Sequence, residues 1–316
     1  MLGFIPLLSG CSSGASDSSP LVSIETVPVM NMGNESDTET GFGKVDYNFA
    51  IGKYIITVGQ YVIFLNAKAS VTDKPAIIDL WNTDMEDPAS YVSDGFIKRT
   101  GSGTINDPYI YSEIIDNNLG VNSSQRGMPN INWFSAARFA NWVNNGATED
   151  SDTETGAYNL NYATDGVFIK QSDAKWWIPS ENEWYKAAYY DPTLNNGNGG
   201  YYEFPTSSDT QTISSTPTES TNTANYDGIM PSKMKITSVG AYSNSHSYYG
   251  TYDQGGLLWQ WNDATYRDHN GVALNRGMRG GSWSLGLINI SKYGQRDYPP
   301  SYQDDDSGFR LATTIN

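Results

Sequence analysis

The fold of this chain is decided by the stretch Arg276-Gly-Met-Arg-Gly-Gly-Ser-Trp283, which is followed by Gly308-Phe-Arg-Leu311. Two earlier stretches carry a similar mixture of residues, Trp177-Ile-Pro-Ser-Glu-Asn-Glu-Trp-Tyr-Lys-Ala-Ala188 and Asp253-Gln-Gly-Gly-Leu-Leu-Trp-Gln-Trp261. The whole chain has 31 Gly, 22 Tyr and 9 Trp among 316 residues, and only 17% of its residues are charged. This composition favours a loop-rich α+β fold over a helical bundle, because aromatic packing and hydrogen bonds must hold its irregular backbone.

The four stretches together resemble the formylglycine-generating (sulfatase-modifying factor) family. The resemblance covers roughly residues 41–316. It implies that family's fold, a variant of the C-type lectin fold, which is an α+β, loop-rich domain with short antiparallel strands and a few packed helices. Nothing in the composition divides the chain in two, and 316 residues are enough to bury the core of one large domain.

The resemblance also implies where a reactive cysteine pair would lie. Catalytic members of the family carry it shortly after the Gly-Gly-Ser that here is Gly280-Gly281-Ser282, and in them the pair binds copper and activates oxygen. By position the two sites fall near Leu285 and Ile290, whose aliphatic side chains are neither soft metal ligands nor nucleophiles. We therefore expect a protein that is not an enzyme of this type.

Residue counts exclude two further classes of function. Another branch of the family, the sulfoxide synthases, uses a histidine cluster on iron, whereas this chain has only His246 and His269, outside any ligand spacing. The formal net charge is −16, and the 19 Lys and Arg residues are scattered along the chain. A nucleic-acid partner is not expected, because phosphate binding needs a basic surface.

The N-terminal residues predict a lipid anchor at Cys11, the single cysteine of the chain. Cys11 follows Leu-Ser-Gly after an apolar run, which matches the lipobox of bacterial lipoproteins. We expect residues 1–11 to be a signal peptide with its lipobox, residues 12–40 a flexible tether, and residues 41–316 the domain. Acyl chains on Cys11 would anchor the protein in the bacterial cell envelope, exposed at the surface of the outer membrane. The alternative is a cysteine without a role in a leader sequence.

Hydrophobic spacing predicts the main elements of the domain. Alternating apolar and polar residues over Gly41–Tyr54 indicate a half-buried strand. Thr57 and Gln60 have the spacing of a capping box at a helix start, and a second helix is expected over Trp133–Asn144, where Asn-Gly follows as a stop signal. The stretch Asp73–Arg126 between these helices reads as an insertion or a long loop.

A second capping box precedes the helix that contains Trp184. Ser180 and Glu183 have the required spacing of three residues. Glu181 and Glu183 form a pair of carboxylates that suggests acid/base catalysis, but residues two apart on a helix do not face each other. We therefore interpret the two glutamates as capping and ion-pairing groups.

The resemblance implies two calcium sites to examine. In the family, an Asn and a Glu within Gly-Asn-Val-Trp-Glu-Trp help to bind calcium, and here Leu257 and Gln260 take their positions, so this site is expected to be lost. Another family site begins at an Asn in an Ala-Asn-aromatic context, which makes Asn225 and the Tyr226 carbonyl candidate ligands for a structural calcium ion. Trp259 and Trp261 are expected in the core, with Trp261 also at the floor of a pocket.

The segment 276–311 resembles the variable region of proteins that retroelements diversify, several of which share this fold. In such a system, AAC codons of a template become NNC codons. NNC codons never specify Lys, Gln, Glu, Met or Trp. Tyr supplies rigid contact area in such a surface, and Asp, Ser and Asn supply adaptable hydrogen bonds. The candidate ligand-binding residues are Trp283, Leu285, Gly286, Leu287, Asn289, Tyr293, Gly294, Asp297, Tyr298, Ser301, Tyr302, Asp304, Asp305 and Asp306.

These observations favour a lipid-anchored, non-catalytic surface protein that binds a protein or glycan ligand through its diversified C-terminal face. On an open face, Leu285 and Leu287 would be exposed apolar groups, and replacing the candidate side chains would hardly change stability. Two alternatives remain: an oxidoreductase of the formylglycine-generating type that acts on protein cysteine, and a plain structural protein of the envelope.

Overall fold

A computed structural model describes residues 19–71, 80–86, 95–116, 121–231, 234–267 and 270–315. Its helices are α1 (Val58–Lys68), η1 (Thr83–Met85), η2 (Ser123–Gln125), α2 (Trp133–Asn144), α3 (Glu181–Tyr189), α4 (Leu194–Gly197) and α5 (Leu287–Ile290). Its strands are β1 (Thr26–Val29), β2 (Phe49–Gly52), β3 (Ile97–Thr100), β4 (Ile110–Glu113), β5 (Ile115–Asp116), β6 (Val121–Asn122), β7 (Trp176–Trp177), β8 (Tyr190–Asp191), β9 (Gly200–Tyr201), β10 (Ile213–Ser214), β11 (Thr223–Ala224), β12 (Trp259–Arg267), β13 (Ala273–Arg279), β14 (Gln295–Tyr298), β15 (Ser307–Phe309) and β16 (Ala312–Thr313).

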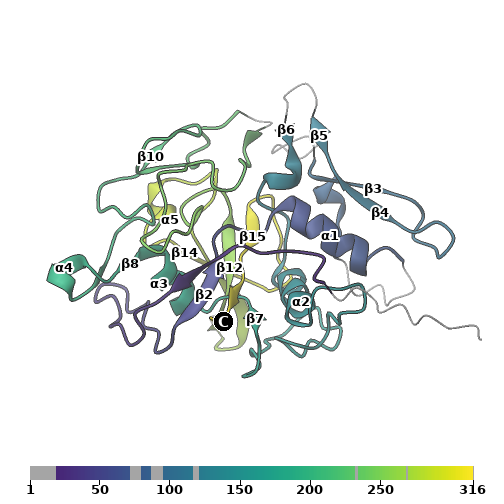
Figure 1. Ribbon diagram of the computed structural model, residues 1–316, viewed down its shortest axis with the longest axis horizontal. Coiled ribbons are helices and arrows are strands. Elements are labelled where there is room, and N and C mark those ends of the chain that lie inside the picture. Colours follow the sequence, from purple (N-terminus) through teal and green to yellow (C-terminus); the bar gives the residue numbers. More distant parts are fainter. Residues whose placement is uncertain are drawn as a thin grey trace, which may run out of the picture.

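Two four-stranded sheets organise the described part of the chain (Figure 1). The first has the order β1-β2-β16-β7, and β16 lies between strands from distant parts of the sequence, with Ala312 opposite both Ile51 and Trp177. The second has the order β14-β13-β12-β15, in which β15 runs parallel to β12 and the other pairs are antiparallel. Strand β14 therefore forms an edge of the second sheet, and the candidate binding residues lie on and around it.

Helices α1 and α2 pack on each other beside strands β12 and β15 (Figure 1). Phe139 of α2 contacts Phe64 of α1, with ring centroids 5.2 Å apart, and Phe309 of β15, with centroids 5.4 Å apart. Both predicted helices are confirmed. The Thr57 hydroxyl accepts a hydrogen bond from the backbone N–H of Gln60. The side-chain oxygen of Gln60 accepts one from the backbone N–H of Thr57, as the capping box requires.

The stretch expected to be an insertion or a long loop contains defined elements. Strands β3 and β4 form a hairpin that projects beside α1 (Figure 1). Asn66 of α1 binds it, because its side chain donates to the Tyr111 carbonyl at 2.9 Å and accepts from the Tyr111 N–H at 3.0 Å. The Arg99 guanidinium lies 3.5 Å from the Trp81 ring centroid and 4.3 Å from that of Tyr109. Spacing alone missed this hairpin because its contacts are made with other segments.

Two boundaries differ from the sequence prediction. The tether expected over residues 12–40 is too long, because residues 26–29 form β1 and pair with β2, and Val29 is fully buried. Cys11 and the first part of that tether lie outside the described residues. The strand expected over Gly41–Tyr54 is confined to Phe49–Gly52, since Gly41 and Gly43 adopt positive φ angles of 79° and 95° and end any extended run.

None of the helices within the described residues has the length and hydropathy that crossing a bilayer requires.

Candidate binding face

The backbone under the candidate face is fixed by two glycines and by a neighbouring loop. Gly280 and Gly281 have φ angles of 100° and 67°, and a Cβ at Gly281 would lie 2.9 Å from the Asn289 carbonyl oxygen. After this turn, the Trp283 carbonyl accepts from Gly228 N–H at 2.8 Å, and the Leu285 carbonyl accepts a similar bond at 3.0 Å. The start of the face is thus held by main-chain bonds that do not depend on its side chains.

A buried ion pair fixes the middle of the face. Arg279 forms an ion pair with Glu181 of α3, and both side chains are almost fully buried. The Arg279 guanidinium also donates to the carbonyls of Lys292, at 2.9 Å, and Gly294, at 3.0 Å. Glu181 additionally accepts from the Asn262 amide at 2.5 Å. The Arg279 guanidinium therefore contacts both α3 and the loop between α5 and β14, and it fixes that loop.

The two glutamates of α3 are structural, as the sequence predicted. Glu183 completes the capping box with Ser180, and its carboxylate also accepts from the Trp177 indole at 3.1 Å and from the Tyr47 hydroxyl at 2.7 Å. Glu181 binds Arg279, so each carboxylate is used in a buried network. Both carboxylates therefore act as capping and ion-pairing groups.

The structure separates the candidate binding residues into three groups. The exposed ones are Tyr293, Asp297, Ser301 and Asp304. The half-buried ones are Trp283, Leu285, Gly286, Leu287, Asn289, Tyr298, Tyr302 and Asp305. The buried ones are Gly294 and Asp306.

An aromatic stack with a guanidinium is the main feature of the face. The rings of Tyr298 and Tyr302 are parallel, with centroids 3.9 Å apart and an interplanar angle of 9°. The Arg296 guanidinium lies 4.4 Å from the Tyr298 centroid and donates to the Tyr298 hydroxyl at 2.7 Å. Arg296 and Tyr298 alternate with exposed residues along β14, so they share one side of the strand. The Tyr302 hydroxyl in turn donates to Asp304 at 2.6 Å.

Carboxylates and a lysine surround this stack. Burial, with the charges of Asp304 and Asp306, raises the pKa of Asp305 to about 6, and the charge of Lys235 opposes this shift. The Lys235 ammonium lies 4.3 Å from the Trp283 ring centroid, so this cation joins Trp283 to the acidic end of the face. Burial also raises the pKa of Asp306, which contacts Arg296 at 3.4 Å.

Several expectations about the face are corrected by these positions. Gly294 cannot vary freely, because a Cβ there would lie 2.1 Å from the Asn289 carbonyl oxygen, and Asp306 is buried against Arg296. Leu285 is half-buried against the main core, and Leu287 packs on a smaller cluster around Ile290. They are therefore not the exposed apolar groups that were expected.

The same packing corrects the expected effect on stability. Tyr298 and Tyr302 also contact the main core, whereas Tyr293 is 48% exposed.

Sequence reasoning missed Ile288, which is 63% exposed within α5, and Arg296. The signal for Ile288 was its place in a run of candidate residues, and that for Arg296 was its alternation with Tyr298 along a strand.

Hydrocarbon side chains occupy the two positions that the resemblance assigns to the copper-binding cysteines. Leu285 is half-buried on the main core, and Ile290 is fully buried beside Phe204 and Tyr226. Hydrocarbon side chains fill both positions that the cysteine pair would take, and they cannot ligate a soft metal. Within the described residues, no three His, Cys, Asp or Glu side chains lie close enough together to hold a metal ion.

The first calcium position does not fit the ion. Leu257 is buried with a φ angle of 66°, a conformation that Asn tolerates better than Leu. The Gln260 oxygen accepts from the Trp184 indole at 2.9 Å and from Arg310 at 2.6 Å, and its amide donates to the Asp253 carbonyl at 2.6 Å. Hydrogen bonds within the protein therefore use the Gln260 side-chain oxygen twice and its amide group once.

The second calcium position fits in part. The Asn225 side-chain oxygen is buried without a hydrogen-bond partner in the described part of the chain, which is the state of a potential ligand. The Tyr226 carbonyl, however, already accepts from the Ser214 hydroxyl at 2.6 Å. Of these two candidates only Asn225 offers a free oxygen, whereas calcium takes about six to eight oxygen ligands.

The two tryptophans of β12 lie in the core as expected, but Trp261 does not line an open pocket. Trp259 and Trp261 are both buried in the main core. The Trp261 indole donates to the Ile131 carbonyl at 2.7 Å and is fully buried. It is therefore not the floor of an open pocket.

Comparison with known proteins agrees with this architecture. The sequence matches the family described as sulfatase-modifying factor enzyme 1-like domain over residues 24–315. None of the curated proteins matches it. Among solved structures, Treponema denticola variable protein 1 is similar with 16% identity and a TM-score of 0.54, covering 93% of this chain and 96% of that chain. CarF is similar with 17% identity and a TM-score of 0.52, covering 93% and 99%.

These likenesses show that the fold of a variable protein and of CarF is the fold found here. The family match spans nearly all of the described chain, including both sheets and the candidate face. This chain belongs to the sulfatase-modifying factor enzyme 1-like family.

Proposed function

We propose that this protein is a non-catalytic surface protein that binds a protein or glycan ligand through residues 283–305. The observation that carries the proposal is the stack of Arg296 and Tyr298, on the edge strand β14, with Tyr302, which follows that strand. Tyr, Trp and Arg are the residues that most often dominate binding energy at interfaces. Here they are held in place before any ligand arrives, so little conformational entropy is lost on binding.

The replacement of the family's reactive centre supports a non-catalytic role. The positions of the cysteine pair are filled by Leu285 and Ile290, and the chemistry of that pair has no substitute there. Arg279, Glu181 and the carbonyls of Lys292 and Gly294 form a buried frame under the face, beside the Gly280-Gly281 turn. A fold that keeps its frame and lacks its reactive groups is suited to presenting a surface.

The binding test compares side chains on the face with a matched position elsewhere. Purified protein is applied to arrays of glycans and of surface proteins, together with Tyr298→Ala, Tyr293→Ala and Tyr248→Ala. Tyr248 is 44% exposed and belongs to a different loop, so it controls for loss of an exposed tyrosine. We expect the first two variants to lose about 1–4 kcal/mol of affinity for a ligand that binds this face, and Tyr248→Ala to bind it normally. Equal loss in all three would contradict a localised face.

Diversification is the second part of the proposal. The candidate residues, apart from Trp283, belong to the set that NNC codons specify. We expect differences between strains to be concentrated at Tyr293, Asp297, Ser301 and Asp304, which are exposed, and to spare Gly294, where a Cβ has no room. Sequencing the gene from many strains tests this, and differences spread evenly along the gene would favour a plain structural envelope protein.

Membrane anchoring is the third part, and it rests on the sequence Leu-Ser-Gly-Cys11. We propose that Cys11 is lipidated and holds the protein at the surface of the bacterial outer membrane. Radiolabelled palmitate should enter the wild-type protein and not Cys11→Ser. Equal labelling of both would remove this part of the proposal and leave the binding face untouched.

A further inference from the structure

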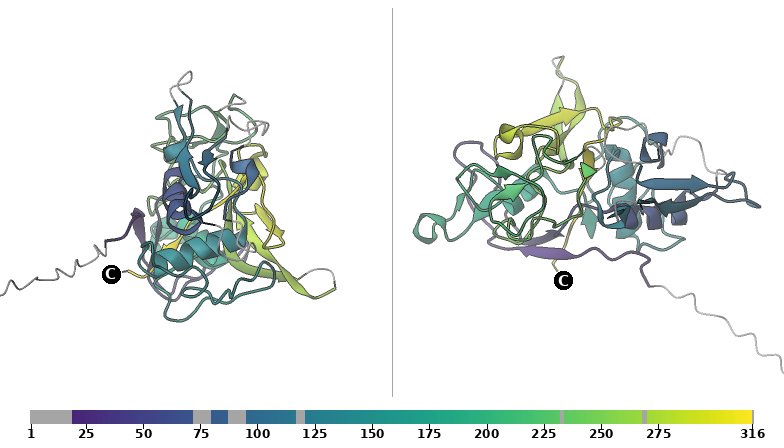
Figure 2. Two further views of the ribbon diagram at one scale, coloured as in Figure 1. Left: turned by 90° about the vertical axis from the view of Figure 1, so that its right-hand side faces the viewer. Right: turned by 90° about the horizontal axis from the view of Figure 1, so that it is seen from above.

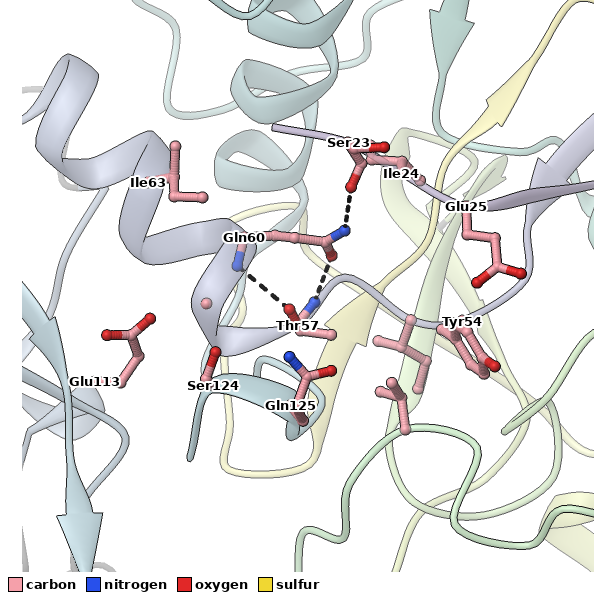
Figure 3. A pocket seen from close by; sticks show the side chains of 13 residues that line it. Ser23, Ile24, Glu25, Tyr54, Thr57, Gln60, Ile63, Glu113, Ser124 and Gln125 are labelled. Atoms are coloured by element: carbon pink, nitrogen blue, oxygen red, sulfur yellow. Dashed lines mark hydrogen bonds between the residues drawn. The ribbon is translucent and has the colours of Figure 1, made fainter. Parts of the chain in front are cut away.

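A cavity lies around the start of α1, away from the candidate face. It has a volume of about 490 Å³ and is lined by residues 23–25, Tyr54, the first turn of α1, β4 and η2 (Figure 3). Figure 3 shows Glu25 and Tyr54 at one end and Glu113 and Ile63 at the other. In the right-hand view of Figure 2, the purple N-terminal strand lies at the bottom and the yellow segment that contains α5 and β14 lies at the top, whereas the C-terminal strand β16 belongs to the same sheet as β1.

The walls of this cavity are held by hydrogen bonds inside the protein. Gln60 takes part in the capping box with Thr57 and also donates to the Ser23 carbonyl at 2.8 Å (Figure 3). The Lys53 N–H donates to the Glu25 carbonyl at 2.9 Å, and the Gln125 carbonyl accepts from the Val239 N–H at 2.9 Å. These hydrogen bonds hold the walls of the cavity in place, and small-molecule sites are usually largely pre-formed in this way.

Both carboxylates in the cavity are already compensated. Glu25 forms an ion pair with Lys53 at 2.8 Å. Glu113 lies against the first turn of α1, where a Cβ at Gly59 would be 3.4 Å from its Oε1 atom and where the helix itself has no acidic residue. The positive end of the α1 dipole thus faces the Glu113 carboxylate. A cationic ligand is not needed to balance these charges, and no Lys or Arg is among the described lining residues, so an anion is not favoured either.

The remaining lining groups suit a neutral ligand with many hydroxyls. Within the described part of the chain, the side chains of Gln125 and Glu113 make no hydrogen bond to the protein, so an amide and a carboxylate are available as donor and acceptors. Tyr54 adds an aromatic ring, which stacks on Tyr252 with centroids 5.5 Å apart, and Ile63 adds an apolar edge. Alternating polar groups and C–H surface are what a sugar ring presents.

We propose that this cavity binds a neutral saccharide of one or two rings, with Gln125 and Glu113 on its hydroxyls and Tyr54 against its C–H surface. This site is separate from the C-terminal face, and the inference does not rest on the proposed function. It requires no metal, because the hydrogen-bonding groups of the protein contact the sugar directly.

The test uses isothermal titration of the purified protein with glucose, N-acetylglucosamine, maltose and cellobiose, and with spermidine as a cationic probe. We expect saturable binding of at least one sugar, with a dissociation constant in the millimolar range, and about tenfold weaker binding in Gln125→Ala. Ile63→Trp should fill the cavity and abolish binding. Ile63 is 37% exposed, so this change should leave the fold intact.

Ile105→Trp is the matched control, because Ile105 is 81% exposed at the β3–β4 turn and does not line the cavity. It should bind the sugar as the wild type does. Failure of all four sugars to bind, saturation by spermidine alone, or equal binding to Ile63→Trp and Ile105→Trp would each overturn the proposal. The alanine variant Tyr298→Ala of the C-terminal face should leave sugar binding unchanged, which keeps this test distinct from that of the proposed function.

Discussion

The frame beneath the C-terminal face and the face itself use the same residue types in opposite ways. Arg279 in the frame is 1% exposed, forms a buried ion pair and binds two carbonyls. Arg296 on the face is 24% exposed, contacts Asp306 at 3.4 Å and stacks on Tyr298. The two arginines lie on paired strands, since β13 ends at Arg279 opposite Gln295 and β14 contains Arg296, and the connection between these strands includes α5. The comparison shows that burial, and not residue type, separates an arginine that stabilises the fold from one that is exposed on the face.

The largest effect should come from breaking the frame. Glu181→Ala would leave the Arg279 guanidinium buried without its carboxylate, and loss of one partner from such a pair typically costs about 3–5 kcal/mol. Arg296→Ala, which removes a more exposed pair, should cost much less. Urea unfolding of both variants measures the difference. Equal losses would mean that the frame and the face are not distinct in energy.

A smaller effect should separate the half-buried face residues from the exposed ones. Tyr298→Ala removes a ring that packs on the core and on Tyr302, so we expect a loss of about 1–3 kcal/mol in the free energy of unfolding. Ser301→Ala, at an exposed position, should change it by less than about 0.5 kcal/mol. Thermal melting checks both. If the Tyr298 variant were as stable as the Ser301 variant, the stack would be purely a surface feature.

A pH effect should arise at the acidic end of the face. Since burial raises the pKa of Asp305 from 3.8 to about 6, the folded protein binds more protons than the unfolded chain in this interval. Stability from this group should therefore fall as pH rises through that window. Asp305→Asn should reduce the slope without removing it, because the pKa of Asp306 is also raised by burial.

The measurement for Asp305 is the melting temperature at closely spaced pH values. Asp297→Asn, at an exposed position of β14, serves as the control and should keep the wild-type slope. A melting temperature that rises with pH in this window, or a pH dependence that Asp305→Asn does not change, would show that Asp305 is not responsible for the effect.

The smallest expected effect is on chemistry. Incubation with Cu(I) and a peptide with the Cys-x-Pro-x-Arg sulfatase motif should leave the peptide cysteine unchanged, because Leu285 and Ile290 occupy the positions of the cysteine pair. Mass spectrometry of the peptide is the readout. Conversion of the cysteine to formylglycine would refute the non-catalytic proposal and restore the oxidoreductase alternative.

Local interactions were the part of the fold that sequence alone determined. Both capping boxes join residues three apart, so Thr57 with Gln60 and Ser180 with Glu183 could be identified without any knowledge of distant segments. The bounds of the helix Trp133–Asn144 followed from the same kind of evidence. The family motifs added the fold, because their Gly, Trp and Arg residues build the turn and the frame.

Tertiary structure decided which residues of the face reach solvent. Leu285 and Tyr298 are half-buried because the main core lies behind them, and Gly294 is constrained because the Asn289 carbonyl lies against it. The cavity at α1 likewise depends on Glu25 and Glu113, which are far apart in sequence and meet only in the folded chain. Burial and charge compensation are set by contacts between distant segments, and such contacts leave no periodic signal in the sequence.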